Sequence, residues 1–146
     1  MENLGEKLYD IRIPMSPSPS KVVLATDSPQ IASIIRAKLE RDGLEVFWRP
    51  DGKAAIEFVQ SNPPDLMIID SILPDLSGLD LLERIRSLPG LESLPVFVLL
   101  DVLQEHSAEE FLRRQAQEVL PKPFRPTDLS KKIRKILSSR PVPASK

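Results

Sequence analysis

One buried strand that ends in a carboxylate constrains the fold of this 146-residue chain more than any other feature. Residues 66–69 (Leu-Met-Ile-Ile) form an uninterrupted apolar run, which is typical of a strand covered on both faces. Asp70 follows it, and a loop rich in Pro, Asp, Ser and Gly then leads to a helical pattern from Gly78. In open α/β sheets, ligands bind at the carboxyl ends of the strands. We therefore expect Asp70 to be a reactive carboxylate at such an edge.

Apolar runs and helical periodicities alternate along the rest of the chain. Strands are expected at residues 22–25, 44–49, 66–69, 95–100 and 119–120. Helices are expected at about residues 29–41, 53–61, 78–88, 104–115 and 126–138. The second strand alternates apolar and polar residues, which predicts an edge position, and the fourth helix is expected to bury Phe111 and Leu112. Five strands that alternate with five helices predict a parallel sheet with helices on both faces.

The length of 146 residues is enough for one ordinary domain and not for two, and we place this domain at residues 21–139. Residues 1–20 are expected to be a flexible arm with a Pro/Ser linker, and residues 140–146 a tail too short for an output domain. The 20 basic and 21 acidic residues nearly cancel, which argues against nucleic acid or membrane binding by overall charge. The absence of cysteine excludes disulfides and thiolate metal sites, and no signal peptide or membrane span is evident, so a cytoplasmic location is expected.

Four charged side chains follow the predicted strands and should meet at the carboxyl edge of the sheet. They are Asp27, Asp70, Asp101 and Lys122. Carboxylates gathered in this way repel one another unless a cation intervenes, and Mg²⁺ prefers such oxygen ligands together with retained waters. A carboxylate nucleophile beside Mg²⁺ and a lysine can accept a phosphoryl group. Neither the Rossmann glycine fingerprint nor a P-loop is present, which argues against a nucleotide site of either kind.

Three segments together resemble the receiver domain of bacterial response regulators. They are residues 21–29, 64–78 and 120–124, and the resemblance extends over about 21–139. It implies a flavodoxin-like, doubly wound sheet of order 2-1-3-4-5. It also implies phosphoryl transfer from a histidine kinase or phosphotransfer protein to Asp70, with Mg²⁺ required and Lys122 paired with the phosphoryl group. No enzymatic activity is implied beyond self-phosphorylation and autodephosphorylation at Asp70.

The chain departs from the pattern of the family that it resembles at four positions, so we expect an atypical, degenerate member. The first strand usually ends in two acids, whereas this chain has Thr26 and Asp27. Asp27, Asp70 and the backbone carbonyl of Ile72 are still expected to bind Mg²⁺, with weaker affinity. Leu100 and Asp101 replace a hydroxyl residue and a small residue, and Val119 replaces an aromatic switch residue. The four atypical positions are therefore Thr26, Leu100, Asp101 and Val119.

Two functions follow from this pattern. The first is a stand-alone receiver that is phosphorylated on Asp70 and signals through protein–protein contacts with an unknown downstream partner. The alternative is a pseudo-receiver, a protein-interaction module that works without phosphorylation because Asp101 pairs with Lys122. An aspartate-nucleophile hydrolase is disfavoured, since Ile72 stands where those enzymes have their second aspartate.

The basic residues near the C-terminus and the single histidine each have an ordinary and a functional interpretation. Basic residues dominate 122–140, with seven Lys or Arg against Asp128 alone, which indicates a solvated helix face or a docking face for an acidic partner. His106, the only histidine, is expected to be solvent-exposed rather than part of a phosphorelay.

Overall fold

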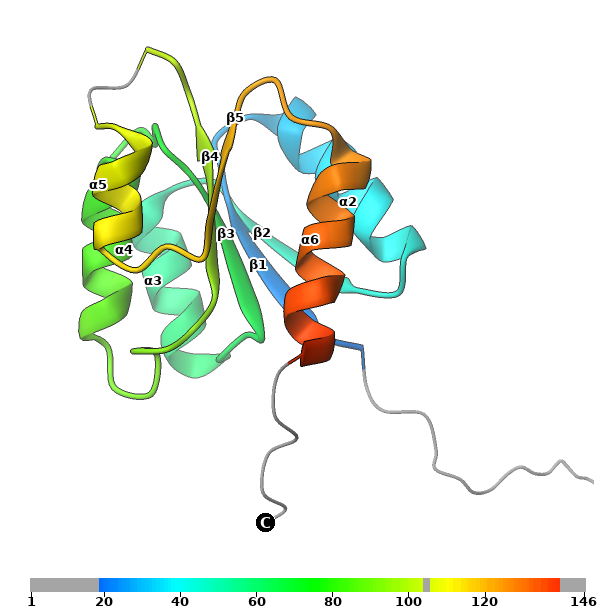
Figure 1. Cartoon of the computed structure of the whole chain (residues 1–146). Coiled ribbons are helices and arrows are strands. Elements are labelled where there is room, and N and C mark those ends of the chain that lie inside the picture. Colours follow the sequence, from blue (N-terminus) through cyan, green and yellow to red (C-terminus); the bar gives the residue numbers. More distant parts are fainter. Residues whose placement is uncertain (1–18, 104–105, 140–146) are drawn as a thin grey trace, which may run out of the picture.

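The computed structural model describes residues 19–103 and 106–139, in which strands and helices alternate (Figure 1). The strands are β1 (Lys21–Ala25), β2 (Glu45–Arg49), β3 (Leu66–Asp70), β4 (Val96–Leu100) and β5 (Glu118–Pro121). The helices are α2 (Pro29–Arg41), α3 (Gly52–Ser61), α4 (Gly78–Ser87), α5 (Ala108–Arg113) and α6 (Pro126–Ser139). The predicted tail and residues 1–18 of the predicted arm lie outside the described residues.

All neighbouring strands run parallel, in the order β2-β1-β3-β4-β5. The predicted flavodoxin-like sheet is therefore confirmed, with β2 at an edge. β3 lies in the middle of the sheet, and all five of its residues are buried, which explains its continuous apolar run. Because the strands are parallel, their carboxyl ends share one edge, and Asp70 lies at the centre of that edge.

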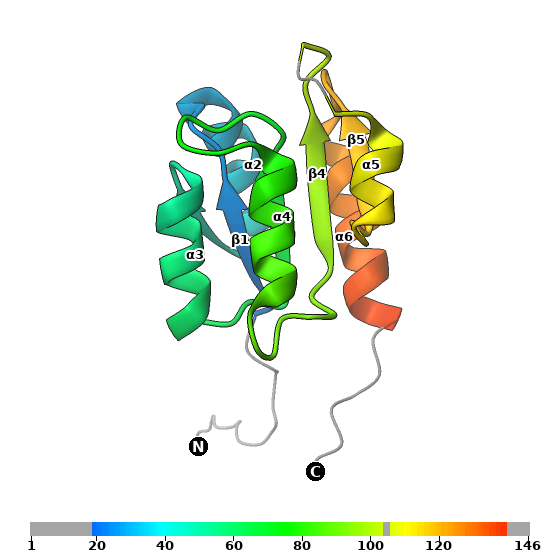
Figure 2. The ribbon, with the colours of Figure 1, turned by 90° about the vertical axis from the view of Figure 1, so that its left-hand side faces the viewer.

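Helices cover both faces of the sheet and enclose two apolar clusters. Figures 1 and 2 show α3, α4 and α5 on one face and α2 and α6 on the other. Successive strand residues alternate between the clusters, as a pleated strand requires: Met67 and Ile69 belong to the first, and Leu66 and Ile68 to the second. None of the described helices is long and apolar enough to cross a membrane.

The fourth predicted helix is shorter than expected, because its start is fixed by a capping box. The Ser107 side chain accepts the Glu110 N–H, while the Glu110 carboxylate accepts the Ser107 N–H, so α5 begins at Ala108 rather than at residue 104. The prediction for Phe111 is confirmed, since its side chain is fully buried. The prediction for Leu112 is wrong: the core-facing position of this short helix is taken by Phe111, and Leu112 is 50% exposed.

Asp75 joins the loop after β3 to the start of α3. Its carboxylate accepts the backbone N–H groups of Gly52 and Lys53 at 2.9 and 2.8 Å, while Asp51 caps the same helix by accepting the Ala54 N–H. Partial burial raises the pKa of Asp75, but the backbone hydrogen bonds together outweigh it and hold this pKa below its ordinary value of 3.8.

We expect Asp75→Asn to lower the free energy of unfolding at neutral pH by about 0.5–1 kcal/mol, because the amide keeps one acceptor oxygen but loses the second acceptor and the negative charge beside the start of α3. Since folding lowers this pKa, the unfolded chain binds the proton more readily. The stabilisation is therefore complete above the ordinary pKa of 3.8 and is lost as the pH falls through the lower pKa of the folded state. Urea denaturation of both proteins across this range measures the effect.

The matched control is Glu92→Gln, which removes an exposed carboxylate that forms no hydrogen bond or ion pair with the described residues. This variant should follow the wild-type pH dependence. An Asp75→Asn difference that stays constant between neutral and acidic pH would contradict the assignment of this cap.

Candidate functional site

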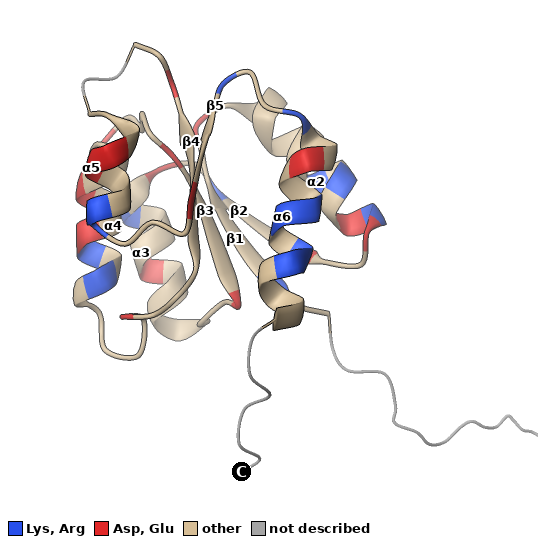
Figure 3. Ribbon diagram, viewed as in Figure 1, with Lys and Arg blue, Asp and Glu red and all other residues tan. Residues whose placement is uncertain are grey.

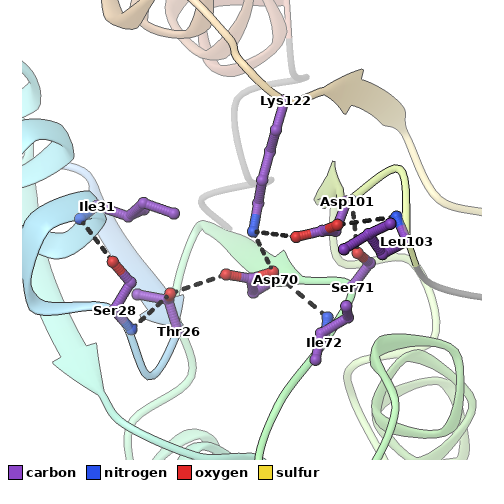
Figure 4. A network of polar contacts seen from close by, with 9 residues as sticks. All are labelled: Thr26, Ser28, Ile31, Asp70, Ser71, Ile72, Asp101, Leu103 and Lys122. Carbon is purple, nitrogen blue, oxygen red and sulfur yellow. Dashed lines mark hydrogen bonds and ion pairs between the residues drawn. The ribbon is translucent and has the colours of Figure 1, made fainter.

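Asp70 is buried at the end of β3, with 2% of its surface exposed, and both of its carboxylate oxygens have hydrogen-bond donors (Figure 4). Oδ2 accepts the Thr26 hydroxyl at 2.9 Å. Oδ1 accepts the Lys122 ammonium at 2.8 Å and the Ile72 backbone N–H at 3.3 Å. A buried carboxylate is tolerated only when it is paired and hydrogen-bonded, and these three donors meet that requirement.

Thr26 is held in place from several sides. Its hydroxyl accepts the Ser28 N–H at 3.2 Å, which leaves the hydroxyl proton free to point at Asp70. Its backbone N–H donates to the Arg49 carbonyl at 3.1 Å, and its carbonyl accepts the Trp48 indole N–H at 2.7 Å. A second carboxylate here would repel Asp70, whereas the hydroxyl stabilises it. The sequence marks Thr26 only as a departure from the family pattern and does not predict its hydrogen bond to Asp70.

Lys122 lies between two carboxylates. It follows β5, its backbone N–H donates to the Leu100 carbonyl, and the peptide bond to Pro123 is cis. Its Nζ lies 2.8 Å from Asp70 Oδ1 and 3.7 Å from Asp101 Oδ2, with the Lys122 and Asp101 side chains 22% and 29% exposed. The predicted Asp101–Lys122 pair is present, so one ammonium faces two negative charges.

The backbone beside Asp70 requires glycine at position 78. A Cβ atom there would lie 2.7 Å from the Asp70 carbonyl oxygen and 2.7 Å from Ser71 Cα, both of which are backbone atoms. The Gly78 N–H donates to the Ser71 carbonyl, and Ile72 and Ser77 form a bridge that closes the loop. This closed loop leaves the Ile72 side chain 42% exposed at the rim of the site.

The donors available for Mg²⁺ are fewer than a fully protein-based site needs. Asp27 is exposed and directly follows Thr26, which contacts Asp70. Among residues 19–103 and 106–139, no three His, Cys, Asp or Glu side chains lie close enough to hold a metal ion. Asp27, Asp70 and the Ile72 carbonyl are hard oxygen donors of the kind that Mg²⁺ accepts, with water as its remaining ligands.

Leu100 and Val119 lie on neighbouring strands and pack against the same apolar cluster. Leucine has no hydroxyl with which to contact a phosphoryl oxygen, and valine lacks an aromatic ring. The hydrogen bonds of the site therefore come from other positions, namely Thr26, Ile72 and Lys122.

His106 is less exposed than predicted. Its ring nitrogen lies 3.0 Å from the Glu110 carboxylate, and its ring meets the Phe111 ring edge-on, which leaves the side chain 26% exposed. The backbone N–H of Ser107, followed by the hydrogen bond to His106, lowers the pKa of Glu110. His106 therefore supports the first turn of α5 and lies outside the Asp70 network.

The basic residues of α6 are exposed, and Figure 3 shows in blue where they lie along the helix. Lys132 lies 3.7 Å from Glu118 of β5. The last basic residue of the predicted run, Arg140, lies outside the described residues.

Comparisons with known proteins agree with this geometry. A family model described as the response regulator receiver domain matches residues 22–134. The sensor histidine kinase TmoS of Ectopseudomonas mendocina is 31% identical over 120 residues, which are 82% of this chain and 12% of the kinase. The phosphate regulon transcriptional regulatory protein PhoB of Rhizobium meliloti is 31% identical over 117 residues, 80% of this chain and 52% of PhoB. The chain thus spans only part of these relatives.

Solved structures have the same fold. A putative response regulator from Chloroflexus aurantiacus superposes with a TM-score of 0.77 at 28% sequence identity, covering 82% of this chain and 98% of the other.

We expect Thr26→Val to lower the free energy of unfolding by about 1–3 kcal/mol, because valine keeps the shape of threonine but leaves Asp70 Oδ2 without its donor. Urea denaturation at neutral pH measures this change. The other threonine, Thr127, is exposed in the first turn of α6, and Thr127→Val is the control. Equal losses in the two variants would show that the Thr26 hydroxyl contributes nothing specific.

Proposed function

The chain belongs to the response regulator receiver family, whose members are signalling modules of two-component systems, and we propose that it signals by accepting a phosphoryl group on Asp70. One observation carries the proposal: a carboxylate fixed at the end of the central strand has a lysine ammonium 2.8 Å away. The proposed donor is the phosphohistidine of a histidine kinase or phosphotransfer protein. Output would pass through contacts with a downstream protein rather than through nucleic acid or membrane binding, and we place the protein in the cytoplasm.

The transfer would use groups already in position. An oxygen of the Asp70 carboxylate attacks phosphorus, the bond between phosphorus and the histidine nitrogen breaks, and the imidazole takes up a proton. The Lys122 ammonium would neutralise charge on the transferring oxygens. Since Thr26 and Ile72 fix the orientation of the carboxylate, little reorganisation would be needed.

Asp27, Asp70 and the Ile72 carbonyl would hold Mg²⁺ in this proposal. The metal would supply further neutralisation of the phosphoryl oxygens. We expect weaker affinity than at a site with two acids after the first strand, because Thr26 contributes no charge and its hydroxyl already occupies Asp70 Oδ2. We propose no enzymatic activity beyond self-phosphorylation and autodephosphorylation at Asp70.

The test is phosphorylation with acetyl phosphate and Mg²⁺, followed by intact-mass measurement. Wild type should gain one phosphoryl group at partial occupancy, and Asp70→Asn should gain none because the amide is not a nucleophile. Asp75→Asn is the control, because it removes a carboxylate that lies in the same loop but contacts the start of α3 and not Lys122. This variant should be phosphorylated like wild type. Absence of an adduct in wild type would reject phosphorylation of Asp70.

A second function, a phosphorylation-independent interaction module, is favoured by one specific contact. The Asp101 carboxylate already shares the Lys122 ammonium at 3.7 Å and would repel an incoming phosphoryl group. Leu100 and Val119 also lack the groups that transmit phosphorylation in typical receivers. In this function the site would be a fixed structural network.

Partner capture separates the two functions. For the phosphoaccepting receiver, we expect the phosphorylated wild type and Asp70→Ala to recover their partner in clearly different amounts in a pull-down from the native host. The reason is that only wild type can add the charge to which the partner responds. Equal recovery would assign the protein to the phosphorylation-independent class.

A further inference from the structure

The Asp101 carboxylate connects the Asp70 site to a surface turn, because its two oxygens have different partners (Figure 4). Oδ2 lies 3.7 Å from Lys122 Nζ, whereas Oδ1 accepts the Leu103 backbone N–H at 2.9 Å. The backbone N–H of Asp101 donates to Ser71 Oγ at 2.8 Å, so its main chain is anchored beside β3. The side chain can therefore move while the backbone of this residue stays in place.

The turn that Asp101 closes carries the two most exposed large hydrophobic side chains of the described residues. Val102 is 78% exposed and Leu103 is 87% exposed. An aspartate that accepts the N–H two residues later forms a local turn, which sets the direction of the residues inside it. Two adjacent apolar side chains held in this way form a small contact surface, and Asp101 determines its shape.

We propose that phosphorylation of Asp70 expels the Asp101 carboxylate from Lys122 and opens this turn, so that Asp101 transmits the state of the site to Val102 and Leu103. This inference rests on the proposed function of Asp70. A phosphoryl group brings about two negative charges and strong acceptor oxygens, which compete for the lysine ammonium. Asp101 then loses its partner and faces a like charge, so its carboxylate moves outward.

In typical receivers a hydroxyl residue and an aromatic residue transmit the phosphorylation of the aspartate. This chain lacks both groups, and Asp101 would transmit the signal instead. Leu100 has no hydroxyl to bind a phosphoryl oxygen, and Val119 has no ring to follow such a move. Both side chains are packed against the apolar cluster and have no polar group to sense the new charge. The response is therefore expected at residues 101–103, with α5 and β5 little changed.

Two substitutions separate the charge of Asp101 from its hydrogen bond. Asp101→Asn removes the negative charge but keeps an amide oxygen that can accept the Leu103 N–H. Asp101→Ala removes both the charge and the acceptor. Expulsion requires the charge, so only wild type can switch between a closed and an open turn.

The experiment follows the Leu103 amide by NMR before and after treatment with acetyl phosphate and Mg²⁺. In that reaction the phosphoryl group passes to Asp70 and acetate leaves. In wild type, phosphorylation should raise the solvent exchange rate of this amide at least about fivefold, as expected for loss of one hydrogen bond. In Asp101→Asn the rate should stay low in both states, and in Asp101→Ala it should be high in both.

Each other outcome overturns the inference. If intact-mass analysis shows the adduct but the wild-type Leu103 amide does not respond, the inference is wrong while the proposed function stands. If Asp101→Asn responds as strongly as wild type, the charge of Asp101 is not the cause. If no variant forms an adduct, the proposed function fails, and this inference fails with it.

Discussion

The burial of one negative charge at the end of β3 is the constraint on which the site depends. Asp70 is 2% exposed, and its charge is compatible with that position only because Thr26, Lys122 and the Ile72 N–H donate to it. These donors come from the residue that follows β1, from the loop after β5 and from the loop after β3. The carboxylate therefore forms hydrogen bonds with segments that are far apart in the sequence. These segments lie close together because the parallel strands end at the same edge of the sheet.

The same network explains how an atypical receiver keeps a stable site. At the position where the resemblance to receivers implies a second acid, this chain has a hydroxyl that donates to Asp70 instead of repelling it. At the position where the resemblance implies a small residue, this chain has Asp101, which shares the lysine ammonium. Both changes favour the unmodified site. A phosphoryl donor would therefore have to compete with contacts that the protein already makes.

Much of the fold could be predicted from the sequence, because it depends on features that are local or periodic. The apolar run before Asp70 specifies β3, and Ser28, which caps α2 by accepting the Ile31 N–H with Pro29 as the first helical residue, marks the start of that helix. The contacts of the site were harder to predict. That Thr26 donates to Asp70 follows from the register of β1 against β3, which pairs Ala25 with Ile69 and brings the next residues together. No local sequence pattern predicts how β1 is aligned with β3.

The wrong predictions for α5 have two different causes: the capping box at its start is a local sequence pattern, whereas the burial of Phe111 rather than Leu112 depends on the packing of the folded chain. The start of α5 was placed too early because the capping box at Ser107 was not recognised, and Leu112 was assigned to the core although the six-residue helix buries Phe111. His106 is predicted to be solvent-exposed, yet its side chain contacts Glu110 and Phe111 and is only 26% exposed.

The indole of Trp48 places a natural fluorophore close to Asp70. Trp48 is the only tryptophan in the chain, and its N–H donates to the carbonyl of Thr26, whose hydroxyl in turn donates to Asp70. Two hydrogen bonds and one residue thus separate the sole strong fluorophore from the carboxylate. We therefore expect the emission of the natural protein to respond to changes at this edge of the sheet without an attached label.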